Sequence, residues 1–138
     1  IGVHSYTYQS EFSNTKVLSK WAPLQKVTIK TEAAAQAPTV KSVKTSGQGK
    51  TRNTTVSFKL PKGATGTDWV LSKQVYKNDK GAYTGVGSYS YVVKNQTKST
   101  ITFEKVRPGT YYLTGHAYTK GYVKNFTRWS KIRKIVIK

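Results

Sequence analysis

The last ten residues of the chain repeat ten residues near its start. Residues 129–138 read WSKIRKIVIK and residues 21–30 read WAPLQKVTIK, with the tryptophan, one isoleucine and two lysines identical. The similarity extends backwards, because LTGHAYT at residues 113–119 aligns with IGVHSYT at residues 1–7. The two tryptophans are 108 residues apart, which is the length of a domain and far longer than a solenoid repeat. We therefore expect part of one domain followed by a whole second domain.

The composition indicates an all-β fold class. No segment has helical periodicity, and the short apolar runs are rich in Tyr, Val and Thr and separated by Gly and Lys, which favours strands. Cysteine is absent, so neither disulfides nor thiolate metal sites can form and packing alone must hold the core. No run approaches the roughly 20 apolar residues of a membrane-spanning helix, and no signal peptide is visible. We predict no membrane span.

Alternating apolar and polar residues predict seven strands after residue 38. We expect strands at residues 40–43, 56–60, 69–76, 83–93 (one or two strands), 99–106, 111–119 and 129–138. The side chains expected to face inward are those of Val56, Phe58, Leu60, Ile101 and Phe103. Turn-forming residues at 78–81 and 107–109 separate the strands.

The two repeat copies share an irregular apolar spacing. Ile132, Ile135 and Ile137 are separated by three and then two residues. The same spacing separates Leu24, Val27 and Ile29. Because a step of three breaks the strand period of two, we predict a β-bulge in both copies, between Ile132 and Ile135 and between Leu24 and Val27. An irregularity kept in both copies indicates a shared fold.

Three segments carry a family resemblance. PGTYY at residues 108–112, HAY at residues 116–118 and RWSK at residues 128–131 resemble the F and G strands of a fibronectin type III domain, of the variety found in bacterial surface and secreted proteins. The resemblance covers residues 38–138 as one complete seven-stranded, immunoglobulin-like β-sandwich. It implies that residues 1–30 are the F–G hairpin of a preceding, similar domain, with residues 31–37 as the linker.

The resemblance also assigns individual residues. It implies that Tyr111, in preference to Tyr112, is the corner tyrosine whose hydroxyl bonds back to the backbone, and that Trp69 is the core aromatic residue. Gly115 stands where the family usually has an inward valine, and Phe58 stands where many members have tryptophan. These two departures predict a looser core. No Arg-Gly-Asp motif is present, so integrin-type adhesion is not supported.

The titratable side chains do not predict an enzyme. The five acidic residues have no spacing that would pair two carboxylates on one face: they are Glu11, Glu32, Asp68, Asp79 and Glu104. Catalysis needs titratable groups that converge on one site. His4 and His116 occupy equivalent places in the repeat, and we expect both to face solvent. We predict no catalytic residue, no metal site and no cofactor.

The charge is strongly positive and unevenly distributed. The formal net charge is +19. The first 37 residues hold four lysines and two glutamates, whereas the remainder holds 20 basic and three acidic residues. Such a field attracts polyanions in a salt-dependent way. Lysines that keep a sheet soluble and protect its edges are the alternative interpretation.

Two sets of side chains are candidates for contact with a partner. The predicted polyanion-binding face follows the last strand and the segment before it, and consists of Lys120, Lys124, Arg128, Lys131, Arg133 and Lys134. The predicted aromatic contact surface, suited to sugars or stacked bases, consists of Tyr83, Tyr89 and Tyr91. Cross-strand packing of the tyrosines is the alternative.

These observations lead to three functional hypotheses. The first is a non-enzymatic, extracellular structural or adhesive module of a bacterial surface protein, held on anionic cell-wall polymers such as teichoic acid. The second is an assembly subunit, whose N-terminal hairpin completes a neighbouring chain by β-augmentation, in a filament or in a swapped dimer. That hairpin would contribute its apolar residues Ile1, Val3, Leu24, Val27 and Ile29, or pack on the adjacent repeat. The third is non-specific binding of nucleic acid or glycosaminoglycan.

Overall fold

The computed structural model describes residues 6–8, 16–23, 36–120 and 124–138. The chain divides into two compact units, Ile1–Glu32 and Ala33–Lys138. All regular secondary structure in the described ranges is β-strand, and the strands pair in antiparallel sheets. The predicted all-β fold class is therefore confirmed.

The first unit contributes one two-stranded sheet. β1 (Tyr6–Tyr8) pairs with β2 (Lys16–Leu18). The residues proposed for assembly all lie outside the described residues, as does His4: they are Ile1, Val3, Leu24, Val27 and Ile29. The assembly role therefore stays a prediction.

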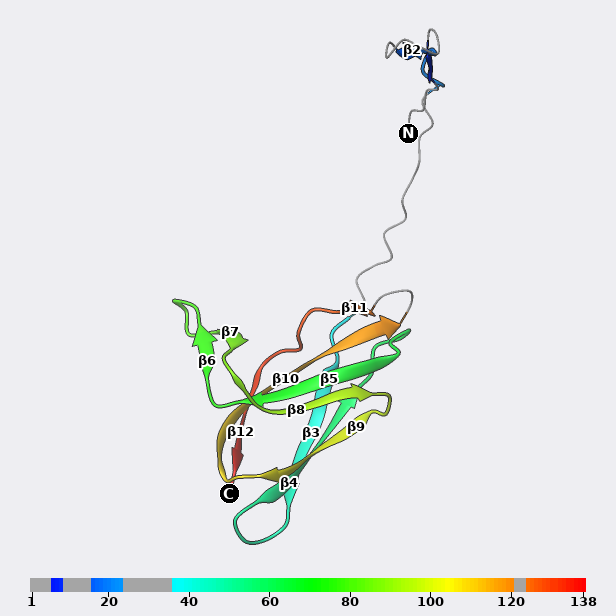
Figure 1. Cartoon of the computed structure of the whole chain (residues 1–138). Helices are drawn as coiled ribbons and strands as arrows, with labels where there is room; N and C mark the ends of the chain where they lie inside the picture. Colours follow the sequence, from blue (N-terminus) through cyan, green and yellow to red (C-terminus); the bar gives the residue numbers. More distant parts are fainter. Residues whose placement is uncertain (1–5, 9–15, 24–35, 121–123) are drawn as a thin grey trace. The chain divides into compact units, whose positions relative to one another are not determined.

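The second unit consists of two larger antiparallel sheets and one hairpin (Figure 1). The first sheet has the order β3-β4-β9, from β3 (Thr39–Ser46), β4 (Arg52–Lys59) and β9 (Thr100–Val106). The second has the order β11-β10-β5-β8, with β12 also pairing with β10, from β5 (Gly66–Ser72), β8 (Tyr89–Gln96), β10 (Gly109–Lys120), β11 (Lys124–Phe126) and β12 (Arg133–Ile137). The hairpin of β6 (Val75–Lys77) and β7 (Tyr83–Val86) is inserted between β5 and β8.

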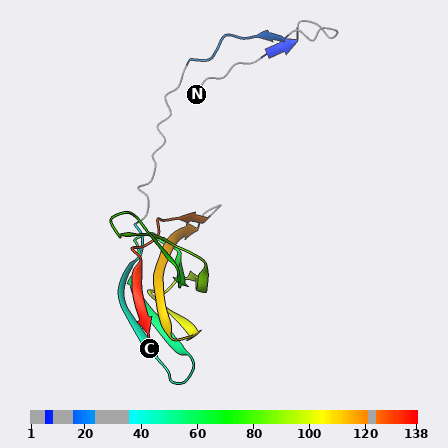
Figure 2. The same ribbon diagram turned by 90° about the vertical axis from the view of Figure 1, so that its left-hand side faces the viewer.

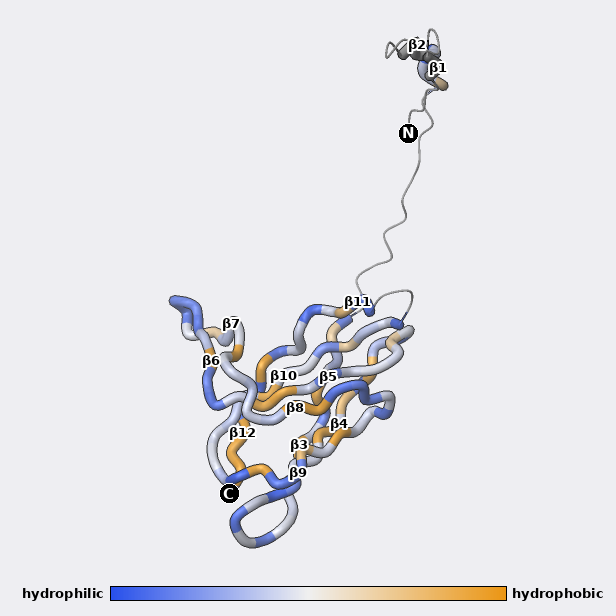
Figure 3. The backbone as a smooth tube through the Cα atoms, viewed as in Figure 1, coloured by the Kyte–Doolittle hydropathy of each residue, from blue (hydrophilic) through white to orange (hydrophobic). Residues whose placement is uncertain are grey.

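The second unit has two ends, which are marked by different parts of the chain. In both perpendicular views, the C-terminus and the turn between β3 and β4 lie at one end and β11 lies at the other (Figures 1 and 2). Hydrophobic positions lie along the strands, whereas the tip of the β6–β7 hairpin is hydrophilic (Figure 3).

One hydrophobic core joins the two sheets. It contains residues from β4 and β9 of the first sheet and from β5, β10 and β12 of the second. The predicted inward residues are buried, except that Leu60 follows the end of β4 and is half-buried against the core. Burial of apolar area on both sheets, worth about 25 cal/mol per Å², holds them face to face as in a β-sandwich.

Gly115 makes room for the core tryptophan. Trp69 is fully buried and its ring centroid lies 4.7 Å from that of Phe58. A Cβ atom at Gly115, which is the register partner of Trp69, would lie 2.4 Å from the indole ring. The indole therefore fills the space that an inward valine would occupy. At Gly115 the predicted looser packing is not found, because a small residue on β10 and a large one on β5 are complementary.

Tyr111 forms the predicted bond to the backbone. Its hydroxyl donates to the carbonyl of Arg107 at 2.9 Å. The amide of Arg107 donates to the hydroxyl of Tyr91 at 3.0 Å, and the two tyrosine rings meet edge to face at 5.8 Å. Burial raises the pKa of the Tyr111 hydroxyl, Tyr91 raises it further, and the positive charge of Arg107 opposes the shift. The neutral phenol is therefore the form that fits the fold.

The predicted third strand is divided in two. We expected one strand over 69–76, whereas β5 ends at Ser72 and β6 begins at Val75. The Ser72 hydroxyl accepts a hydrogen bond from the amide of Gln74 at 3.0 Å and donates to the carbonyl of Ser88 at 2.8 Å. A local side-chain bond of this kind competes with the sheet ladder and ends the strand.

The predicted last strand is shorter than expected. Residues 129–138 were expected as one strand, whereas β12 spans Arg133–Ile137. A separate strand that was not predicted, β11, pairs with the end of β10 before this range begins. The register of β12 is unbroken from Arg133 to Ile137, so the predicted bulge between Ile132 and Ile135 is wrong. Ile132 lies before the strand, which explains the step of three without a bulge.

The irregularity lies further upstream. The chain advances seven residues from Phe126 to Arg133, while β10 opposite advances five, from Tyr118 to Leu113. Two extra residues are therefore accommodated between β11 and β12. They lift this part of the chain off the regular ladder.

The two repeat copies have the same strand register. Tyr6 pairs with Leu18 in the first unit, and the aligned Tyr118 pairs with Phe126 in the second. After the second strand of each pair, a hydroxyl donates to the carbonyl of the next residue, at 3.2 Å for Ser19 and 2.8 Å for Thr127. The sequence repeat is thus matched by a repeated local structure.

Candidate functional site

The outer face of β10 is covered by the chain itself. Tyr111, Leu113 and Ala117 of β10 are fully buried, two of them in the core cluster, whereas Thr114 and His116 alternate with them on the other face. Residues 124–132, which we name the covering segment, include β11 and the irregular stretch that follows it. Their contacts with β10 create the candidate site.

Two hydroxyl groups fix the covering segment to β10. The amide of Thr127 donates to the carbonyl of Ala117, and the amide of Ala117 donates to the Thr127 hydroxyl at 3.0 Å. The amide of Ser130 likewise donates to the carbonyl of Gly115, and the amide of Gly115 donates to the Ser130 hydroxyl at 3.0 Å. Each hydroxyl therefore replaces a carbonyl of the interrupted ladder, which satisfies a backbone donor that would otherwise be buried without a partner.

These bonds place two aromatic side chains over His116. Its imidazole stacks on Phe126 at 4.5 Å and on Trp129 at 4.2 Å between ring centroids. The side chain of His116 is only 15% exposed, and its Nε2 lies 3.5 Å from Oδ2 of Asp68. The prediction that His116 faces solvent was wrong, because the two extra residues before β12 let the covering segment close over it.

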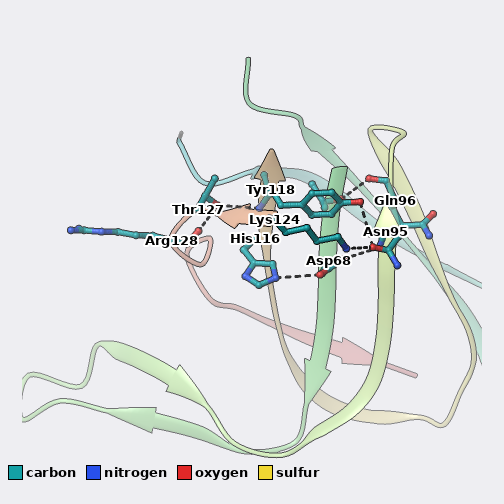
Figure 4. A network of polar contacts seen from close by, with 10 residues as sticks. Asp68, Asn95, Gln96, His116, Tyr118, Lys124, Thr127 and Arg128 are labelled. Atoms are coloured by element: carbon teal, nitrogen blue, oxygen red, sulfur yellow. Dashed lines mark hydrogen bonds and ion pairs between the residues drawn. The ribbon is translucent and has the colours of Figure 1, made fainter. Parts of the chain in front are cut away.

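Asp68 links this stack to a polar network at the start of β5. Its Oδ1 accepts a hydrogen bond from the amide of Asn95 at 2.7 Å, where Asn95 has a left-handed backbone with φ of 59°. The side-chain oxygen of Asn95 accepts from the ammonium of Lys124, which also lies 4.3 Å from the ring centroid of Tyr118. Figure 4 shows this network. Its acid and imidazole are satisfied by neighbours within the fold.

A cleft of about 640 Å³ lies beside the covering segment. We name it the aromatic cleft. One wall is β7 with its preceding turn, and the other is the covering segment at Trp129 to Ile132. Its lining residues are Gly81, Ala82, Tyr83, Thr84, Gly85, Val86, Tyr89, Thr114, Trp129, Ser130, Lys131 and Ile132. The volume is in the range of small-ligand sites.

Three aromatic side chains of the aromatic cleft are open to solvent. The exposed fractions are 37% for Tyr83, 51% for Tyr89 and 42% for Trp129. Tyr83 and Tyr89 belong to the predicted aromatic contact surface, and the cleft contains both. Tyr91 does not belong there, since it is half-buried and packs against Tyr111 on the core side of β8. Residues two apart in a regular strand share a face, but the register of β8 with β5 shifts between the pairs Leu71–Tyr91 and Ser72–Tyr89. The extra residue of this bulge separates Tyr91 from Tyr89.

The β6–β7 hairpin, which forms one wall of the cleft, is stabilised by hydrogen bonds in its turn and by an aromatic contact with β10. The side-chain oxygen of Asn78 accepts hydrogen bonds from the amides of Lys80 and Ala82, at 3.1 and 2.9 Å. Tyr83 meets Tyr112 of β10 edge to face at 5.4 Å. The wall is therefore anchored to the second sheet by aromatic packing, and the turn holds its own shape.

The predicted basic residues are distributed over several surfaces. Lys120 ends β10 and Lys124 begins β11, at one end of the second unit. Arg133 and Lys134 are successive residues of β12, so their side chains point to opposite sides of the sheet. Arg128 extends away from the polar network (Figure 4). Lys131 lines the aromatic cleft, and it lines a second cavity of about 400 Å³ together with Arg133 and residues 37–40. The structure brings only part of this set near the aromatic residues.

The lining residues define the chemical groups of the cleft. Its lining contains no carboxylate and no imidazole. Among the described residues, no group of three or more His, Asp or Glu side chains could hold a metal ion. A membrane-crossing helix is likewise absent from the part of the chain that the structure describes. Aromatic faces, hydroxyls and one ammonium are the groups that a ligand in the cleft would meet.

No protein-family model, curated protein or solved structure matches the chain. The class defined by fold and site is therefore stated in structural terms: an all-β unit of packed antiparallel sheets with a cleft lined by aromatic side chains and one lysine.

Sequence reasoning did not identify Trp129, His116 or Thr114 as parts of this site. Trp129 was visible as the marker of the repeat, but its expected place was the start of the last strand. The signal that could have located it is the pair of hydroxyl residues that flank it, Thr127 and Ser130.

Proposed function

We propose that the chain is a non-enzymatic, extracellular structural or adhesive module of a bacterial surface protein. On this proposal its second unit is a fibronectin-III-like sandwich held on anionic cell-wall polymers. Residues 1–30 would be the closing hairpin of a preceding similar domain.

The strand order supports the fibronectin-III-like assignment. With β3, β4, β5, β9 and β10 as strands A, B, C, E and F, one sheet is A-B-E, and the other contains C, F and a divided G. Immunoglobulin-like sandwiches also have a tyrosine near the start of strand F whose hydroxyl bonds to the backbone a few residues upstream. Tyr111 and the carbonyl of Arg107 have this geometry.

The observation that carries the proposed ligand is the unbalanced charge. The chain from residue 38 onward holds 20 basic and three acidic residues. Among the described residues, the acidic group in contact with a basic side chain is that of Asp68, which meets the imidazole of His116, and no lysine or arginine there has an acidic partner within 4.0 Å. The positive charge is therefore available to an external polyanion, which would release its own counterions on binding.

Retention on a teichoic-acid resin tests the proposal. We expect retention at low salt and a log affinity that falls linearly with log salt concentration. Elution only above about 0.5 M NaCl would indicate recognition beyond charge, whereas early elution, equal to that from heparin and DNA resins, would favour the non-specific polyanion hypothesis. Passage through the resin at low salt would contradict the proposal.

The repeated register supports a second candidate, the assembly subunit. β10 pairs with β5 along one edge and with β11 and β12 along the other. Its counterpart in the first repeat copy is β1, and the pairing described for β1 is with β2. A strand edge can be completed by another chain. Analytical ultracentrifugation should then show oligomers that disappear when residues 1–30 are deleted. A monomer at all concentrations would exclude this candidate.

A further inference from the structure

We propose that the aromatic cleft binds a segment of an anionic glycan. In this arrangement a sugar ring lies against Trp129 and Tyr89, and its acidic substituent faces the ammonium of Lys131. The inference rests on the proposed function for the origin of the ligand, and it adds the site and the chemical class that would be recognised.

The aromatic rings are held from behind, so their free faces are available. Trp129 stacks on His116 with an interplanar angle of 20°, yet 42% of its surface is exposed. The flanking Thr127 and Ser130 are fixed to β10 through their hydroxyls. Tyr89 lies in β8 with its ring 6.2 Å from that of Trp129 and tilted by 53°. Little side-chain entropy remains to be lost when a ligand arrives.

The shape and lining of the cleft fit a sugar better than a flat apolar ligand. A pyranose has an apolar face of C–H groups and a rim of hydroxyls. The negative faces of Trp and Tyr rings attract the former, and hydroxyls such as that of Thr84, with exposed main-chain groups, suit the latter. The tilted rings of Tyr89 and Trp129 form a concave surface of this kind.

The charge at the cleft selects the kind of glycan. The lining contains one cation, Lys131, and no acid, while the ammonium of Lys77 lies 5.7 Å from the ring centroid of Tyr83. A cationic ligand is therefore disfavoured, and an occasional negative substituent is favoured. A nucleic acid would carry one phosphate for each stacked base and needs several cations along its path. One lining cation fits a sparsely charged glycan.

Fluorescence titration can test this inference, because Trp129 is exposed and Trp69 is fully buried. In a Trp21→Phe background, the emission of Trp129 reports on the cleft. The probes are hyaluronan hexasaccharide, neutral chitohexaose, tripolyphosphate, which carries charge but no sugar, and the oligonucleotide dT6. We expect a saturable change with both sugars, tighter binding of the hyaluronan hexasaccharide, and no saturable change with tripolyphosphate or dT6.

Two variants and two matched controls assign the effect to the cleft. Tyr89→Ala should weaken both sugars about tenfold, as expected for the loss of one aromatic contact. Lys131→Ala should weaken only the hyaluronan hexasaccharide. Tyr76→Ala removes a ring that is 59% exposed on the hairpin but does not line the cleft, and Lys134→Ala removes an exposed lysine of β12. Neither control should change the affinity for sugar.

The opposite results would overturn the inference. They are a lack of saturable change with either sugar, an equal loss in Tyr76→Ala and Tyr89→Ala, or binding of dT6 that depends on Tyr89, which would identify a nucleic-acid site. Retention on teichoic-acid resin together with any of these results would leave the proposed function standing and remove only the glycan site. If the protein is not retained on the resin while the sugars still bind, the glycan site stands and the proposed function is contradicted.

Discussion

Strand β10 is buried on both faces, and the two faces are covered by different means. On the core face, Tyr111, Leu113 and Ala117 are fully buried, and the first two belong to the hydrophobic core. On the outer face, Thr114 and His116 are covered by the covering segment, through hydroxyl bonds and ring stacking. The core face is closed by burial of apolar area, which has no directional requirement. The outer face is closed by bonds that fix the position of each group, as a binding site requires.

This contrast predicts that substitutions on the core face act mainly on stability. Substitutions on the outer face should act first on the geometry of the covering segment and then on ligand binding. Four variants test the contrast, in order of decreasing effect on the free energy of unfolding.

Gly115→Val should have the largest effect. Its Cβ would overlap the indole of Trp69, and overpacking of a core costs about 1–3 kcal/mol or more. Urea denaturation should show a lower midpoint at an unchanged slope. Gly85→Ala is the matched control, because a Cβ there meets the Tyr76 ring at an ordinary 3.6 Å. Equal stability of the two variants would show that the glycine does not make room for Trp69.

Ser130→Ala should have an intermediate effect. It removes the acceptor of the Gly115 amide, which is buried, and an unsatisfied buried donor costs about 1–3 kcal/mol. The emission of Trp129 should shift because the covering segment loses one of its two hydroxyl bonds to β10 next to this tryptophan. Ser90→Ala, at an exposed position of β8, is the control. Unchanged stability and emission would exclude the hydroxyl as a replacement for a ladder carbonyl.

Tyr111→Phe should cost about 1 kcal/mol, the value of one hydrogen bond, and should change the alkaline stability. The pKa of Tyr111 is raised in the folded state, so the folded protein keeps this proton longer than the unfolded chain. Stability from this group is present below the ordinary tyrosine pKa of about 10 and is lost as the pH rises through the folded value. Denaturation between pH 9 and about 11 should show a smaller decline in the variant. An equal decline would contradict this linkage.

Tyr89→Ala should have the smallest effect on folding, about 0.5 kcal/mol or less, because half of the side chain is already exposed to water. The same variant is expected to lose most of its affinity for the glycan. A large loss of stability would show that Tyr89 belongs to the packing of the outer face and not to a ligand surface.

The part of the fold that could be predicted depends on the alternation of apolar and polar residues along a strand, which shows which side chains are buried. Val56 and Phe58 were predicted from alternation alone, because a half-buried strand requires apolar residues at every second position. The bond of Tyr111 followed from a family resemblance and agrees with the geometry. Tyr83 and Tyr89 were chosen as exposed aromatics and do line the cleft.

The part that was missed depends on contacts between residues far apart in sequence. β11 has three residues, too few for an alternation of apolar and polar residues that would distinguish a strand from a loop. The fit of Gly115 against Trp69 needs the register of β10 with β5, and the burial of His116 needs the closure of the covering segment. Local patterns contain neither the register nor the two extra residues opposite β10.

Around Trp129, different residues hold the backbone and line the cleft, and this separation bears on how the site could change. The residues that hold the backbone in place, Thr127 and Ser130, are not the residue that would touch the ligand. Trp129 can therefore be exchanged for another side chain while the loop keeps its path, and the specificity of the cleft can diverge without a loss of foldability. The first repeat copy has Ser19, Trp21 and Ala22 at the corresponding places. The tryptophan is the same there and one of the two hydroxyls is absent, so the two copies differ in the groups that would hold the backbone and agree in the ring that would touch a ligand.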